Sequence, residues 1–191
     1  MTKKRRRASA IGLGLLLAVV AAQGADKGDA MTGETRPAAA RELFKSLEGA
    51  WEGTCRTWFE PGKLADESKI NGRIRPILGG LFHRHEYEST IQGKPRHGEE
   101  TLAFNTVTNR FQVSWIDDFH MNYALMSSEG SASSRGFTVL GKYDVGTGLP
   151  QWGWKTVYEL VDSDHLTISA YNVSPEGQPY LAVETKYRRI K

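Results

Sequence analysis

The segment Phe82–Ser89 has the sequence FHRHEYES, and its alternation decides the class of fold. Successive side chains of an extended chain point to opposite sides, so residues two apart share a face. One face must meet water because it carries three charges, and it consists of Phe82, Arg84, Glu86 and Glu88. The other face is therefore expected to point inward, and it consists of His83, His85, Tyr87 and Ser89. The segment predicts a half-buried β-strand.

Nine other segments are rich in Val, Ile, Thr, Tyr, Phe and Trp and are separated by turns with Gly, Pro, Asn or Asp. The ten runs begin near Ala50, Glu67, Leu81, Arg96, Arg110, Asn122, Gly136, Gly153, His165 and Tyr180. Short connections imply neighbouring antiparallel strands, and an open sheet of this size would expose its edges. We therefore predict an all-β fold, a closed antiparallel meander barrel of about ten strands. A two-sheet sandwich is the alternative.

One short helix is expected before the first strand, at residues 37–47. Pro37 is tolerated in a first helical turn, an alanine-rich run follows, and Gly49 supplies the stop. Leu43, Phe44 and Leu47 fall on one face of this helix. The helix is therefore expected to pack against the barrel.

The N-terminal residues are typical of a secretory signal peptide. Five basic residues precede the apolar run 8–22, which ends in small residues, and cleavage is expected near Gly24. The apolar run falls short of the roughly twenty residues of a membrane-spanning helix, so no permanent membrane anchor is expected. The sequence predicts a signal peptide at 1–24, a flexible tether at 25–36 and one domain at 37–191. The protein is expected to be exported to the periplasm or the extracellular space.

Charge and cysteine content exclude several classes of function. The chain carries a net charge of +3, but the predicted leader holds five basic and no acidic residues, so the mature chain is close to neutral and slightly acidic. Nucleic-acid binding is therefore not expected. Cys55 is the only cysteine, which rules out an intramolecular disulfide and a thiolate metal cluster. We expect Cys55 to be a small buried hydrophobe.

Residues 47–53, LEGAWEG, open the first strand and resemble the Gly-x-Trp-x-Gly opening of calycin-type barrels such as lipocalins, fatty-acid-binding proteins and nitrobindins. Together with Ile77–Phe82, Glu86–Glu88 and Trp115–Asp117, this opening is similar to a bacterial family of exported, calycin-like domains of unknown function. The resemblance spans most of residues 47–191. It implies a barrel in which the tryptophan of the first strand closes one end. It indicates almost nothing about a ligand or a reaction.

The same resemblance raises the question of haem. Nitrobindins carry a longer glycine-rich opening and a haem-ligating histidine late in the chain. Here Thr54–Trp58 replaces the rest of that opening, and the late histidine, His165, stands beside a turn. This departure argues against haem, and no cofactor is predicted.

Two groups of residues suggest chemistry. His83 and His85 share a strand face, and Glu100 on the next strand could complete a three-ligand metal set. Hydrogen-bonded histidines are the favoured interpretation, so no metal is predicted. Asp117 and His120 could act as base and proton shuttle, although capping of a turn by Asp117 is favoured.

The leading hypothesis is a non-enzymatic protein that binds a small, largely apolar ligand in the barrel. A filled lumen would argue against it. The expected ligand-binding residues are His83, His85, Tyr87, Trp115, Asp117, Tyr143, Trp154 and Tyr158. The alternatives are a barrel enzyme acting on a lipid or carbonyl compound, and a structural protein with a filled barrel. Arg56, Arg73 and Arg75 could meet an anionic head group, although solvated charges on the outer face are the favoured interpretation. The sequence leaves the oligomeric state open.

Overall fold

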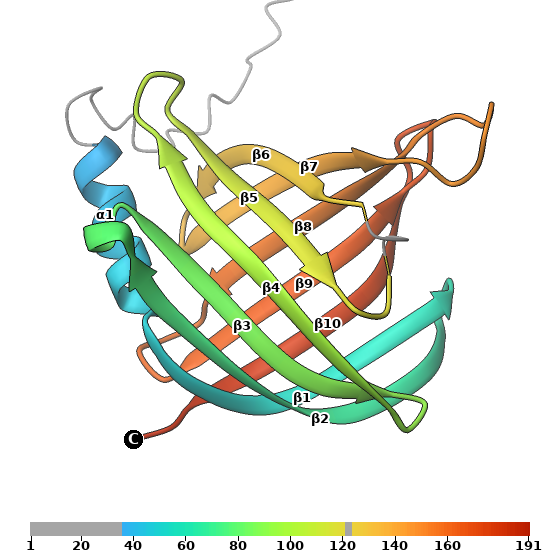
Figure 1. Cartoon of the computed structure of the whole chain (residues 1–191), viewed down its shortest axis with the longest axis horizontal. Helices are drawn as coiled ribbons and strands as arrows, with labels where there is room; N and C mark the ends of the chain where they lie inside the picture. The colour runs from blue at the N-terminus through green and yellow to red at the C-terminus, as the bar shows by residue number, and fades with distance from the viewer. Residues whose placement is uncertain (1–35, 121–123) are drawn as a thin grey trace, which may run out of the picture. The chain divides into compact units, whose positions relative to one another are not determined.

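The computed structural model of the protein describes residues 36–120 and 124–191, and within them it confirms a closed antiparallel barrel (Figure 1). Each strand pairs with its neighbours along the chain, and β1 also pairs with β10, which closes the sheet. The elements are α1 (Arg36–Leu47), β1 (Gly49–Glu60), β2 (Lys63–Ile77), the 3-10 helix η1 (Leu78–Gly80), β3 (Phe82–Ile91), β4 (Lys94–Asn105), β5 (Arg110–Asp117), β6 (Met126–Ser133), β7 (Gly136–Tyr143), β8 (Trp152–Leu160), β9 (His165–Val173) and β10 (Pro179–Arg189).

The predicted boundaries agree with these strands at most positions. Strand β2 begins four residues before the expected Glu67, because Pro61 and Gly62 reverse the chain in a tight turn. The predicted leader, nearly all of the tether and the expected strand start near Asn122 lie outside the described residues. The short helix η1 was not predicted.

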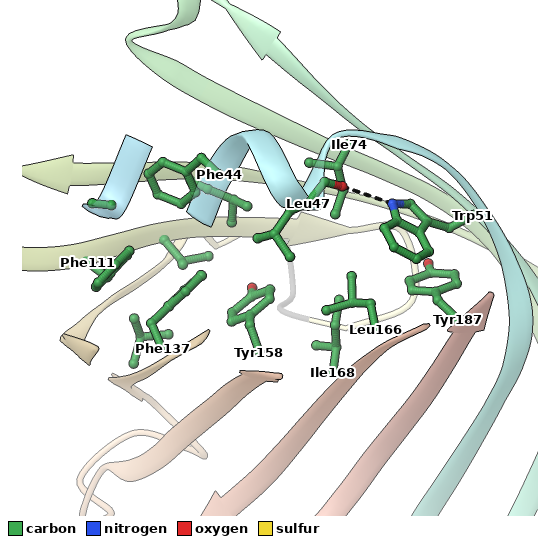
Figure 2. Packing of buried hydrophobic residues seen from close by; sticks show 14 of the residues in the cluster. Phe44, Leu47, Trp51, Ile74, Phe111, Phe137, Tyr158, Leu166, Ile168 and Tyr187 are labelled. Carbon is green, nitrogen blue, oxygen red and sulfur yellow. Dashed lines mark hydrogen bonds between the residues drawn. The ribbon is translucent and has the colours of Figure 1, made fainter. Parts of the chain in front are cut away.

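Helix α1 lies at one end of the barrel, as Figure 1 shows. Its buried residues are Ala40, Phe44 and Leu47. Phe44 meets the edges of Phe111 and Phe137, with ring centres 5.7 and 6.1 Å apart. The apolar face predicted from sequence therefore packs into the end of the barrel, and Figure 2 shows the resulting cluster.

Trp51 connects the helix to both strands that close the sheet. Its side chain is fully buried, and Nε1 donates a hydrogen bond of 3.0 Å to the carbonyl of Leu47 (Figure 2). Arg189, at the end of β10, places its guanidinium 4.0 Å from the centre of a Trp51 ring. The same guanidinium donates to the carbonyls of Ser46, at 2.7 Å, and of Glu48. The last helical carbonyls thus have donors from β1 and β10, which satisfies groups that a helix end leaves unpaired.

We predict that Trp51→Phe lowers the free energy of unfolding by about 1–3 kcal/mol, because the buried Leu47 carbonyl loses its donor. Trp58→Phe is the matched control, since Trp58 lies on the same strand and is partly exposed. Urea denaturation followed by circular dichroism measures both. Equal destabilisation in the two variants would contradict the role given to the Trp51 hydrogen bond.

Candidate functional site

A hydrogen-bonded cluster occupies the middle of the barrel. His85 of β3 and Glu100 of β4 are direct cross-strand partners, and His85 Nδ1 lies 2.6 Å from Glu100 Oε2. His85 Nε2 lies 3.2 Å from the hydroxyl of Tyr187, on β10. The hydroxyl of Tyr158, on β8, donates to Glu100 Oε1 at 2.7 Å. Each oxygen of this buried carboxylate therefore has a partner, as burial of a charge requires.

An aromatic group lies next to this cluster, toward the barrel end away from α1. In Figure 1, β5 runs away from α1, and Trp115 stands near its end. Trp115 stacks on Trp154 with ring centres 5.3 Å apart, and its Nε1 donates to the Tyr87 hydroxyl at 2.8 Å. Tyr143 meets Trp154 edge-on and donates to Asn172 Oδ1 at 2.6 Å. Two flat rings with tyrosines on either side thus line this end.

The position of Tyr87 depends on a glycine in a neighbouring strand. Gly98 is the direct cross-strand partner of Tyr87 on β4. A Cβ atom at Gly98 would lie 2.2 Å from the Tyr87 hydroxyl oxygen, closer than any such contact allows. The missing side chain lets the tyrosine ring lie across β4 and reach Trp115.

Arg96 lies beside Tyr87 and is only 3% exposed. Its Nη2 is 3.5 Å from the sulfur of Cys55, and its guanidinium carbon is 5.1 Å from the centre of the Tyr87 ring. Its Nε is buried and has no hydrogen-bond partner among the residues that the structure describes. Across residues 36–120 and 124–191, no carboxylate forms an ion pair with Arg96.

These groups surround an interior cavity of about 50 Å³. Side chains from β2, β3, β4, β5, β8, β9 and β10 line it, and they include His85, Arg96, Glu100, Trp115 and Trp154. This volume has room for about one or two water molecules. The rest of the lumen next to α1 is filled by the hydrophobic core. A whole ligand therefore cannot enter the barrel without movement of the aromatic side chains.

The structure does not bring all eight predicted ligand-binding residues together. His85, Tyr87, Trp115 and Trp154 line the cavity. Tyr143 contacts Trp154, and Tyr158 donates to Glu100, which also lines the cavity. His83 lies at the α1 end, where Nε2 is 2.9 Å from Glu48 Oε1 and the ring stacks on Phe44.

Asp117 caps a turn, because its Oδ1 accepts from the backbone N–H groups of Phe119 and His120 and its Oδ2 lies 2.8 Å from His120 Nδ1. Its carboxylate therefore has the structural role that the sequence favoured. His83, His85 and Asp117 consequently have three different surroundings.

The structure also places the residues considered for metal and haem. His83 and His85 have separate partners, and no group of three His, Cys, Asp or Glu side chains in the described ranges is arranged to hold a metal ion. His165 is exposed, and its Nδ1 lies 2.9 Å from both carboxylate oxygens of Asp162. The exposed His165 and the small interior cavity do not fit a haem. None of the helices described is long and apolar enough to cross a membrane.

A second hollow, of about 1040 Å³, lies over the outer face of β2 to β5 and is open to solvent. Several of its charged groups have ion-pair partners, as in the contact of 3.0 Å between His97 Nδ1 and Asp118 Oδ2 and the pairs of Glu86 with Arg75 and of Glu99 with Arg84. Such pairs are typical of a solvated sheet face. Tyr87 and His120 line both this hollow and the interior cavity. These two side chains therefore lie between the two spaces.

Arg96, the buried cation of this site, was not predicted from the sequence. Of the arginines Arg56, Arg73 and Arg75, which could meet an anionic head group, Arg56 and Arg75 pair with carboxylates on the partly exposed outer surface. The signal was present, because Arg96 alternates in step with Glu100 and the fully buried Leu102.

Comparison with known proteins gives the family. The family described as "Protein of unknown function (DUF1579)" matches residues 36–189. The chain belongs to the DUF1579 family. No curated protein matches this DUF1579 chain.

Two solved structures resemble the DUF1579 barrel. Rv2717c from M. tuberculosis is 13% identical with a TM-score of 0.59, and the match covers 80% of this chain and 98% of that one. The S-type phycobiliprotein lyase CPES from Guillardia theta is 12% identical with a TM-score of 0.51, covering 80% and 93%. At these identities the likeness extends to the fold alone.

The buried tyrosines can be used to test whether water is excluded from this interior. Burial, with a smaller contribution from the Glu100 charge, raises the pKa of Tyr87, Tyr158 and Tyr187 well above the usual value. Below about pH 10 these tyrosines are neutral whether the chain is folded or unfolded, so they cause no pH dependence. Above it they ionise only in the unfolded chain, so stability must fall as the pH rises.

We predict that at least three of the seven tyrosines ionise only when the protein unfolds at alkaline pH. Absorbance at 295 nm counts tyrosinate, and circular dichroism follows folding in the same titration. In Tyr158→Phe one late-ionising tyrosine should disappear. Ionisation of all tyrosines in the folded protein would show that the interior is open to water.

Proposed function

We propose that this DUF1579 protein binds a small, largely apolar organic molecule at the barrel end away from α1. The stacked pair Trp115 and Trp154, next to a buried polar cavity, carries the proposal. Ligand sites of proteins combine apolar and aromatic walls with a few polar groups that fix orientation. This end of the barrel offers both.

The size of the cavity defines how the ligand would bind. Because about 50 Å³ admits only a small polar group, the apolar body lies against the aromatic rings or displaces them. Aromatic rings provide a large contact area and stack on flat apolar surfaces. The likeness to the phycobiliprotein lyase supports a binding barrel at the level of the fold only.

A binding function is favoured over a catalytic one by the arrangement of the polar residues. A catalytic barrel would use His83, His85 and Asp117. Each of them contacts a different partner, namely Glu48, Glu100 and His120. General acid–base catalysis needs its groups within reach of one substrate position. We therefore propose no reaction.

Binding is expected to quench tryptophan fluorescence, because the ligand contacts Trp115 and Trp154 directly. A titration with 1-naphthylacetamide, a flat and mostly apolar probe, should give a saturable change in wild type. Trp154→Ala should weaken this binding at least tenfold, since half of the stacked pair is removed. Trp58→Ala is the matched control, because Trp58 lies outside the group that lines the cavity. Equal affinity in the two variants would contradict the proposed site.

We also propose that the protein is exported and loses residues 1–24. The basic leader and the short apolar run support this proposal. Expressed in a Gram-negative host, the full chain should yield a periplasmic or secreted product. Its intact mass should correspond to a chain that begins near Ala25. Replacing Leu15, Leu16 and Leu17 with lysine should hold the unprocessed chain in the cytoplasm. A cytoplasmic wild-type product that retains Met1 would overturn export.

A further inference from the structure

We propose that Arg96 is the anchor for an anionic head group, and that the ligand is an amphipathic monocarboxylate. This inference rests on the binding function proposed above and adds the chemical class of the ligand. Three features carry it: the burial of the guanidinium, the engagement of the neighbouring carboxylates and the shape of the cavity.

Arg96 is a buried cation whose partners in the described structure are weak. A buried charge is costly unless another charge or several hydrogen bonds compensate it. Here the contacts are the sulfur of Cys55 at 3.5 Å and the face of the Tyr87 ring at 5.1 Å. Neither contact supplies a carboxylate to the guanidinium. Nε remains without a hydrogen-bond partner among the described residues.

The two carboxylates nearest to this end are engaged elsewhere. Glu100 uses one oxygen for His85 and the other for Tyr158. Asp117 is held by His120 and the turn backbone, and neither carboxylate forms an ion pair with Arg96. Neither carboxylate is therefore a direct ion-pair partner of the Arg96 guanidinium. An added anion would complete the cluster.

The cavity fits the head group of such an anion. The guanidinium is a planar fork that binds carboxylates through parallel hydrogen bonds, and Arg96 lines the cavity. A volume of about 50 Å³ suits a carboxylate group and excludes an apolar body. Trp115 and Trp154 line the same cavity and offer the body an aromatic surface. Together these features select one carboxylate joined to an apolar group.

Calorimetric titration of the full-length protein compares 1-naphthylacetate with 1-naphthylacetamide, which has the same ring system and no charge. Wild type should bind the acid at least tenfold more tightly than the amide. Arg96→Met should abolish this preference, because the affinity for the acid should fall to that for the amide. Arg84→Met, which removes an arginine of the outer face, should keep the preference.

Stability separates an anchor from a packing role. Arg96→Met should unfold at the same or a higher urea concentration than wild type, because it removes a buried charge that has no ion-pair partner among the described residues. Arg96→Lys keeps the charge without the fork and should retain only part of the preference. A preference that persists in Arg96→Met, or equal binding of both probes by wild type, overturns the anion site alone. Failure of both probes to bind wild type overturns the proposed binding function as well.

Discussion

The barrel depends on the contact among Trp51, the end of α1 and Arg189. This contact joins the first strand, the last strand and the helix at one place, so the sheet closes where the helix packs. Closure removes the free edges that ten strands in an open sheet would expose. The indole and the guanidinium also satisfy carbonyls that would otherwise lie unpaired at the helix end.

Closure has an electrostatic consequence for the other end of the barrel. With α1 and the hydrophobic core filling one end, the polar side chains of the interior have little access to water. Hydrogen bonds and charges act more strongly in such surroundings, and an unpaired group is costly there. The Glu100 carboxylate meets this requirement with His85 and Tyr158. Arg96 does not, which distinguishes it from the outer-face arginines that pair with glutamates.

The alternation of residues predicted the inner face well, because a period of two is a local property of each strand. His83 and His85 are both 3% exposed, as expected from the charged residues Arg84, Glu86 and Glu88 on the opposite strand face. Their shared face suggested a shared role, but the strand pattern could not predict which partner each histidine has. Although only two positions separate them on the strand, His83 lies at the helix end beside Glu48, and His85 lies beside Glu100. Partners contributed by distant segments decided the difference.

The sequence by itself determined the β-barrel, the helix before it and the sides of the strands that face inward. These features follow from periodicity, turn residues and helix propensity, which act between near neighbours in the chain. Only the tertiary structure decided how far the lumen is filled and which polar groups meet. The stacking of Trp115 on Trp154 and the isolation of Arg96 depend on strands far apart in sequence. Their distances are set by closure of the whole sheet, which no local pattern encodes.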